Sequence, residues 1–155
     1  MKKINNYIIE KFKINSKNIS KYKYHPKDKD ELMDLLDKLI KERGWEGDFN
    51  DIDTSKITDM SMLFTFSRPK FNGDISEWDV SNVEDMRFMF CDTKFNQDIS
   101  NWDVSSCENM YNMFYGCNNF NYDLNNWDVS KVKDMGYMLD FCPLKKHPPK
   151  WYKDE

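Results

Sequence analysis

The segment WDVSNVEDMRFMF at residues 78–90 recurs twice, as WDVSSCENMYNMF at residues 102–114 and WDVSKVKDMGYML at residues 127–139. The copies begin 24 and 25 residues apart. A degenerate earlier copy without the tryptophan begins at Asp53-Thr54-Ser55. A fixed period of roughly 20–50 residues is the signature of stacked repeat units, each of which buries its apolar side against the next.

The hydrophobic spacing changes halfway through each unit. The apolar residues within 83–90 follow helical spacing, and Ser81 with Glu84 has the pattern of a capping box, so a short helix is predicted there. Each unit then closes with Phe-Asn-x-Asp-Ile or Phe-Asn-x-Asp-Leu. The period of two in these closing segments predicts short parallel strands at residues 74–76, 98–100 and 123–125.

These patterns predict an α/β fold, a solenoid of about four units of 24–26 residues with short parallel strands and short helices. Two sets of repeated residues are assigned structural roles. The tryptophans are expected to form a buried column and the asparagines a ladder of amides: Trp78, Trp102, Trp127, Asn72, Asn96 and Asn121.

An N-terminal strand and helix are expected to cap the first unit. A stripe from Leu32 to Ile40 predicts an amphipathic helix that starts at Asp28 or Asp30 and ends at Gly44. Residues 21–24 alternate like a strand. The predicted organisation is an N-terminal segment at 1–20, the cap at 21–47, the repeats at 48–142 and a C-terminal segment at 143–155 that folds back through Trp151.

Composition narrows the class of protein. The 155 residues carry a net charge of −4, with a net of +4 on residues 1–47 and −8 on the remainder. No apolar run reaches the roughly 18 residues of a membrane span, and the basic start lacks the apolar stretch of a secretory signal. Four cysteines show no C-x-x-C spacing and are expected to be reduced thiols. A cytoplasmic protein without a membrane association is predicted.

The repeated unit W-D-V-S-x-V-x-x-M-x-x-M-F, closing with F-N-x-D-I, resembles the BspA-like leucine-rich-repeat family of surface proteins. The resemblance covers roughly residues 48–142. It implies an atypical leucine-rich-repeat domain, similar to modules used for adhesion and protein binding, without catalytic residues in the repeat. Short versions without a leader look like those carried by phages and mobile elements, which favours the binding role over the adhesin role.

Positions that vary between units are not required for packing in the core. Aromatic and arginine side chains at such positions often anchor protein interfaces. The predicted partner-binding residues are Arg87, Phe88, Tyr111, Asn112, Tyr137, Gln97 and Tyr122. The alternative is that these are scattered surface aromatics in a tyrosine-rich chain.

The tryptophans, the repeated aspartates and the basic N-terminal segment each have both a structural and a functional interpretation. The tryptophans offer a ligand platform if they are exposed. The repeated aspartates, such as Asp74 and Asp79, either accept local backbone N–H bonds or share a calcium ion. The basic, aromatic residues 1–29 offer a nucleic-acid-binding segment. No phosphate loop or nucleophile signature supports an enzyme.

The sequence therefore predicts a non-enzymatic protein-binding module without cofactor or metal, such as a small inhibitor or adaptor from a phage or mobile element. The alternative is a nucleic-acid-associated protein that uses the basic N-terminal segment.

Overall fold

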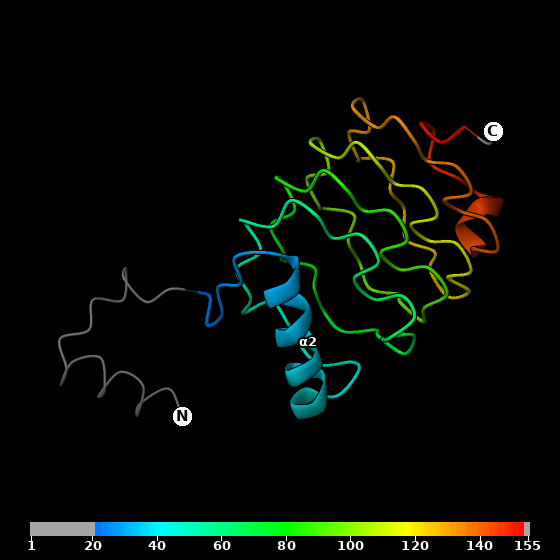
Figure 1. Ribbon diagram of the computed structural model, residues 1–155. Helices are drawn as coiled ribbons and strands as arrows, with labels where there is room; N and C mark the ends of the chain where they lie inside the picture. Colours follow the sequence, from blue (N-terminus) through cyan, green and yellow to red (C-terminus); the bar gives the residue numbers. More distant parts are fainter. Residues whose placement is uncertain (1–20, 154–155) are drawn as a thin grey trace, which may run out of the picture.

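The computed structural model describes residues 21–153, which form a stack of turns with one helix at its end (Figure 1). The helix is α2, Lys29–Arg43, and a short 3-10 helix, η2, spans Pro143–Lys146. Figure 1 shows α2 at one end of the stack and the C-terminal segment at the other. The predicted segment 1–20 lies outside the described residues.

The predicted amphipathic helix is confirmed as α2. The Glu31 amide donates to the Asp28 side chain, which caps the helix, and the chain leaves the helix at Gly44 with a φ of 79°. The face toward the stack is apolar and buried, at Leu32, Leu36, Leu39 and Ile40. The predicted strand before it is absent, since only Tyr24 forms a bridge, to Ile52.

The α/β prediction is wrong for the repeats. Apart from α2 and η2, residues 21–153 contain turns and isolated bridges, with neither a helix inside a unit nor a sheet. In the three segments predicted as strands, only Asp74 pairs, with Asp48. The strand-rich leucine-rich-repeat solenoid that the spacing suggested is therefore not formed.

Side-chain chemistry at the D-x-S sequences explains why no helix starts there. The Ser81 amide and hydroxyl both donate to Asp79 Oδ1, at 3.1 and 2.6 Å. Ser105 and Ser130 amides donate to Asp103 and Asp128 in the same way. These are Asx turns, which satisfy the backbone locally and compete with helix formation. The predicted capping boxes are therefore turns.

Backbone conformation adds a second reason. Seven non-glycine residues of the described part have positive φ, and all seven repeat with the unit period in two columns. The first column is Met62, Phe88, Asn112 and Tyr137, and the second is Phe66, Asp92, Gly116 and Phe141, in which the glycine has a φ of 67°. Left-handed residues interrupt both helical and strand geometry. Each unit is therefore bent at the same two places.

Adjacent units are joined by a ladder of backbone hydrogen bonds at every second residue. The amides of Met86 and Phe88 donate to the carbonyls of Asn109 and Tyr111, at 2.8 and 2.9 Å. The third unit repeats this, since the Met110 amide donates to the carbonyl of Asp134. Parallel bridges link Asp59, Asp85, Asn109 and Asp134 in a row. All these amides point from one unit toward the next in chain order.

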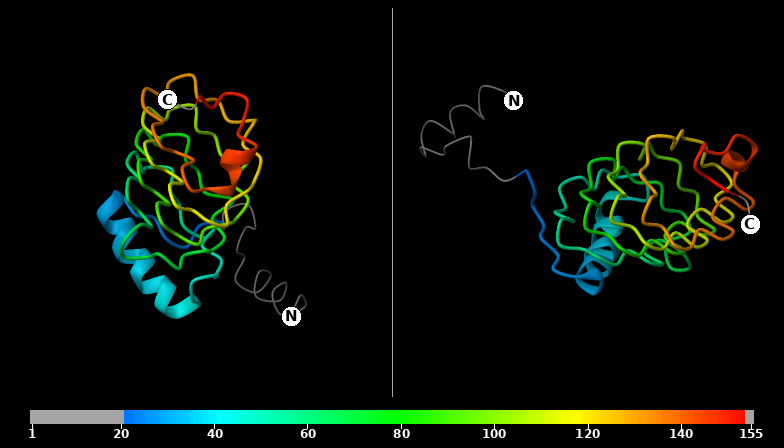
Figure 2. Two further views of the ribbon diagram at one scale, coloured as in Figure 1. Left: turned by 90° about the vertical axis from the view of Figure 1, so that its right-hand side faces the viewer. Right: turned by 90° about the horizontal axis from the view of Figure 1, so that it is seen from above.

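Figure 2 shows the successive turns of the stack between α2 and the C-terminal segment. Aromatic columns fill its interior. Phe64, Phe90 and Phe114 stack with ring centroids 5.4 and 5.5 Å apart. The tryptophan column is buried as predicted, with Trp78, Trp102 and Trp127 each 4% exposed. Each indole N–H donates to a carbonyl of the preceding unit; Trp102 bonds the Ile75 oxygen at 3.2 Å. The indoles are therefore core residues and not an exposed platform.

The C-terminal segment continues the tryptophan column. Trp151 Nε1 donates to the Leu124 carbonyl at 2.8 Å, and its ring lies 6.4 Å from that of Trp127 with an interplanar angle of 5°. The prediction that Trp151 folds back on the last unit is confirmed. No helix in the described part of the chain is long and apolar enough to cross a bilayer.

Candidate functional site

Half-buried and exposed aromatic side chains lie along one side of the stack, at the positions between the two methionines of the last three units; Phe88 and Tyr111 are half-buried and Tyr137 is exposed. Phe88 lies 5.4 Å from Tyr111, and Tyr111 lies 5.9 Å from Tyr137, both edge to face. Tyr137 is 57% exposed, and Met62, at the equivalent position of the first unit, is 44% exposed. We call Met62, Phe88, Tyr111 and Tyr137 the aromatic face.

The ladder fixes this face to the backbone. Met62, Phe88 and Tyr137 have φ values of 57°, 57° and 53°, a conformation that is unusual for bulky residues. It persists because the Met62 and Phe88 amides each donate to the next unit, both at 2.9 Å. The ladder therefore holds the backbone at Met62 and Phe88, whereas Tyr137 stands at the end of the ladder.

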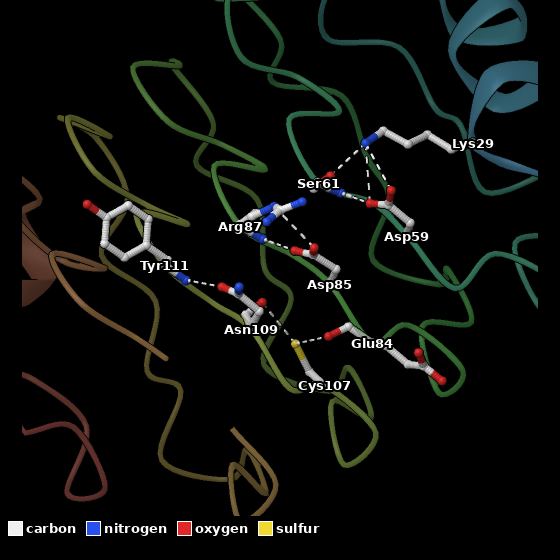
Figure 3. A network of polar contacts seen from close by, with 9 residues as sticks. All are labelled: Lys29, Asp59, Ser61, Glu84, Asp85, Arg87, Cys107, Asn109 and Tyr111. Carbon is white, nitrogen blue, oxygen red and sulfur yellow. Dashed lines mark hydrogen bonds and ion pairs between the residues drawn. The ribbon is translucent and has the colours of Figure 1, made fainter. Parts of the chain in front are cut away.

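Polar side chains line the same ladder beside the aromatic face (Figure 3). Arg87 Nε lies 3.1 Å from Asp85 Oδ2, and the guanidinium is half-exposed. Lys29 of α2 donates to Asp59 and to Ser61 Oγ. Burial of the Asp59 carboxyl opposes its ionisation, but the bonds from Ser61 and the Lys29 charge outweigh it, so the pKa of Asp59 is lowered. One exposed cation, Arg87, therefore accompanies the aromatic rings.

The predicted binding residues separate into two groups. Arg87, Phe88, Tyr111 and Tyr137 lie together, with Asn112 among them. The Asn112 side-chain oxygen is buried and has no partner among the described residues. The other two, Gln97 and Tyr122, lie in the closing segments: Gln97 donates to the Asn72 carbonyl at 2.9 Å, and Tyr122 lies against the core ring of Phe120.

The predicted asparagine ladder forms in part. Asn72 Oδ1 accepts from the Asn96 amide of the next unit at 2.8 Å. Asn96 is half-buried, whereas Asn121 is exposed in the last closing segment. The ladder therefore links the middle units.

The repeated aspartates accept local bonds. Asp74 Oδ1 receives the amide and hydroxyl of Ser76, at 3.0 and 2.7 Å, and these bonds lower the pKa of Asp74. Asp98, Asp103 and Asp128 have lowered pKa values for the same reason. Within residues 21–153, no three His, Cys, Asp or Glu side chains are grouped so that they could hold a metal ion. The backbone therefore satisfies these carboxylates.

Several exposed or functional residues escaped the sequence analysis. Phe66 and Phe141 are 81% and 70% exposed at equivalent positions of the first and last units. The Tyr115 ring lies 5.2 Å from the Phe141 ring. The position of Phe66 and Phe141 is occupied by Phe, Asp, Gly and Phe in the four units. This variability indicates that the core does not require a particular side chain there. Met62 was missed because the first unit lacks the tryptophan that sets the alignment.

The described part of the basic N-terminal segment makes contacts within the protein. Lys21 pairs with Glu77 at 2.6 Å, and Lys23 lies over the Tyr24 ring. His25 Nδ1 lies 3.0 Å from Asp53. The remainder of the proposed nucleic-acid-binding segment, residues 1–20, lies outside the described residues.

The thiols are free and buried. Burial raises the pKa of Cys107 to about 11 and that of Cys117 to about 12. Cys91 and Cys142 are raised to about 11 by burial as well. Because the thiolate is the reactive form, these groups are poor nucleophiles at neutral pH.

Comparison with known proteins gives a family. Residues 34–151, more than half of the chain, match the family described as "Mycoplasma protein of unknown function, DUF285". The chain therefore belongs to this family. Neither a curated protein nor a solved structure matches it.

Proposed function

For this member of a family of unknown function, we propose that the chain is a non-enzymatic protein-binding module that engages another protein through the aromatic face. The observation that carries the proposal is the row of Phe88, Tyr111 and Tyr137, whose rings contact one another across three successive units. Aromatic side chains with an adjacent arginine are the groups that most often anchor protein interfaces.

Exposure and rigidity support this proposal. Met62 and Tyr137 keep about half of their surface in water, so the face offers apolar area that docking would remove from solvent. The ladder bonds already hold the backbone at Met62 and Phe88. A partner would therefore order few additional groups on binding, which lowers the entropic cost of association.

The reaction chemistry of the described side chains favours binding over catalysis. All four thiols have raised pKa values, and the repeated aspartates are occupied by local bonds. The repeat pattern resembles BspA-like surface proteins, and we propose that the chain shares their binding role. The buried thiols also support a reducing compartment, so we propose that it works in the cytoplasm.

The test is a comparison of proteins retained by the full chain and by a Phe88→Ala/Tyr111→Ala variant, each immobilised in native-cell extract at the same density. We expect one or more proteins to be retained by the full chain and reduced at least about tenfold on the variant, since loss of two anchors costs about 2 kcal/mol or more. Labelled mass spectrometry quantifies retention.

The matched control is Tyr122→Ala, which removes an aromatic side chain 36% exposed away from the aromatic face. It should retain the same proteins as the full chain. Equal retention by all three chains would overturn the proposal. Retention that disappears with nuclease treatment, or steeply with salt, would instead support the nucleic-acid alternative.

A further inference from the structure

The last unit of the stack ends in a row of backbone donors without acceptors. In the second and third units the amides at the methionine and at the residue two places on, such as Met110 and Asn112, donate to the following unit. Met135 and Tyr137 occupy these positions in the last unit. Their amides have no hydrogen-bond partner among residues 21–153. We call these two amides, with the Lys133 carbonyl beside them, the open edge.

The Lys133 carbonyl is the acceptor of the open edge. Its equivalents, the Glu84 and Glu108 carbonyls, accept from the Glu108 and Lys133 amides at 2.8 Å. A chain that covered the open edge would therefore donate one N–H and offer two carbonyls. The interface between the third and last units shows how these groups are spaced. There the Lys133 amide donates to the third unit, and the Asp134 and Gly136 carbonyls accept from it.

A hollow with both apolar and lysine side chains in its lining adjoins the open edge. It has a volume of about 230 Å³ and is lined by Val129, Val132, Lys133, Met135, Trp151 and Lys153. The residues equivalent to Val132 and Met135 in the inner units, such as Val83 and Met86, are 0% exposed, whereas Val132 and Met135 are only half-buried. The interior of the stack therefore continues to the surface here.

Charge selects the occupant. Lys133 is 72% exposed and lies 2.6 Å from Glu108 of the unit behind it. Lys131 and Lys153 are also exposed at this end. We propose that the open edge docks an extended acidic segment of a partner protein, with a Glu or Asp beside Lys133 and an apolar side chain in the hollow. A second copy fits poorly, because two open edges facing each other would bring amide donors to amide donors.

This inference is independent of the aromatic face. The test uses a labelled peptide with the sequence of residues 79–90, DVSNVEDMRFMF, which covers the equivalent edge of the first unit through the Glu84 amide and the Asp85 and Arg87 carbonyls. Fluorescence anisotropy with the full chain should show saturable binding. The peptide with Glu84→Lys should bind about tenfold more weakly, a change of about 1.4 kcal/mol.

The most specific test exchanges the charges of Lys133 in the protein and Glu84 in the peptide. Lys133→Glu should reverse the preference, binding the Glu84→Lys peptide more tightly than the unmodified one. Lys56→Glu, the same change at an exposed lysine of the first unit, should leave the preference as it is. In ¹⁵N spectra the Met135 and Tyr137 amides should shift downfield on binding, as new donors do.

Failure of the peptide to saturate, an unchanged preference in Lys133→Glu, or shifts confined to other amides would each overturn the inference. A concentration-dependent dimer that shifts the same two amides without peptide would also overturn it and make a second copy the occupant. None of these results bears on the Phe88→Ala/Tyr111→Ala experiment, so the two proposals can fail separately.

Discussion

The two ends of the stack are finished in opposite ways. At the first unit, α2 lies against the core and cations bond to the chain: Arg68 donates to the carbonyls of Leu63 and Met33, at 2.8 and 3.0 Å. At the last unit, Trp151 covers Trp127, while the amides of Met135 and Tyr137 stay without a partner among the described residues.

The direction of the ladder explains this difference. The amides at the first methionine of a unit and two places on, such as Met86 and Phe88, donate to the following unit. At these positions the first unit therefore presents carbonyls at its outer side and the last unit presents amides. The Leu63 carbonyl of the first unit accepts from Arg68, and Lys29 of α2 donates to the Ser61 hydroxyl, so donors at this end come from within the chain. Amides need acceptors, and the open edge is therefore the end at which a further chain is expected to add.

The largest loss in the free energy of unfolding is expected at the first unit, which α2 covers and which we call the closed end. Arg68 is 1% exposed, and Arg68→Ala removes its hydrogen bonds to the Leu63 and Met33 carbonyls and its contact with Asp37. We expect a loss of about 2–5 kcal/mol in the free energy of unfolding, measured by urea denaturation. Arg87→Ala, at a half-exposed ion pair, should cost less than about 1 kcal/mol. Equal losses would show that Arg68 does not lock α2 to the stack.

A smaller loss is expected at the open end. Trp151 is only half-buried, yet its indole N–H satisfies the Leu124 carbonyl. Trp151→Ala should cost about 1–3 kcal/mol, whereas Trp102→Ala at the centre of the column should cost about 3–5 kcal/mol. Thermal unfolding of the two variants compares them. A loss as large for Trp151 as for Trp102 would mean that the two positions are equally enclosed.

The rate of cysteine alkylation compares the last unit with the middle of the stack. All four cysteines are buried with raised pKa values, so alkylation at pH 7 requires local opening of the structure. Cys142, next to η2 at the open end, should react at least about tenfold faster than Cys107 in the middle of the stack, since regions with less packing open more readily. Mass spectrometry of partly alkylated protein measures both rates, and equal rates would contradict the difference between the ends.

The smallest effect concerns pH at the closed end. Hydrogen bonds and charge from Arg43 lower the pKa of Asp51 below the ordinary value of an aspartate. A lowered pKa contributes stability above the unfolded value that is lost as pH falls through the folded value. Asp51→Asn should therefore cost up to about 1 kcal/mol at pH 7, and the difference should shrink as the pH falls below the usual range of an aspartate. Denaturation of both chains from pH 7 to 2 tests this, and a difference that persists at pH 2 would exclude the charged pair as its source.

Sequence patterns predicted the repeat period, the buried tryptophans and α2, because each depends on spacing that burial alone enforces. They failed on the conformation of the units. Methionine and phenylalanine at helical spacing around Met86 also suit a bent ladder in which alternate residues face the core, and the deciding factor was the Asx turn at Asp79. Left-handed Phe88 and Tyr137 carry no sequence signal, since glycine usually marks such positions.

Part of the candidate site was predictable. Variable positions led to Phe88, Tyr111 and Tyr137, which the fold brings together. The same rule also selected Gln97 and Tyr122, because sequence alone does not show which side of a unit faces outward together. The open edge was invisible, since it depends on the direction of backbone amides.

Amide hydrogen exchange measures the difference between the two ends most directly. Met62, Phe88 and Asn112 donate to the next unit, whereas Tyr137 holds the equivalent place in the last unit. We predict slow exchange for the first three amides and exchange at least about a hundredfold faster for Tyr137 and Met135, since an unbonded amide near solvent needs no opening of the structure. Protection of Tyr137 and Met135 equal to that of Asn112 and Met110 would contradict the open edge.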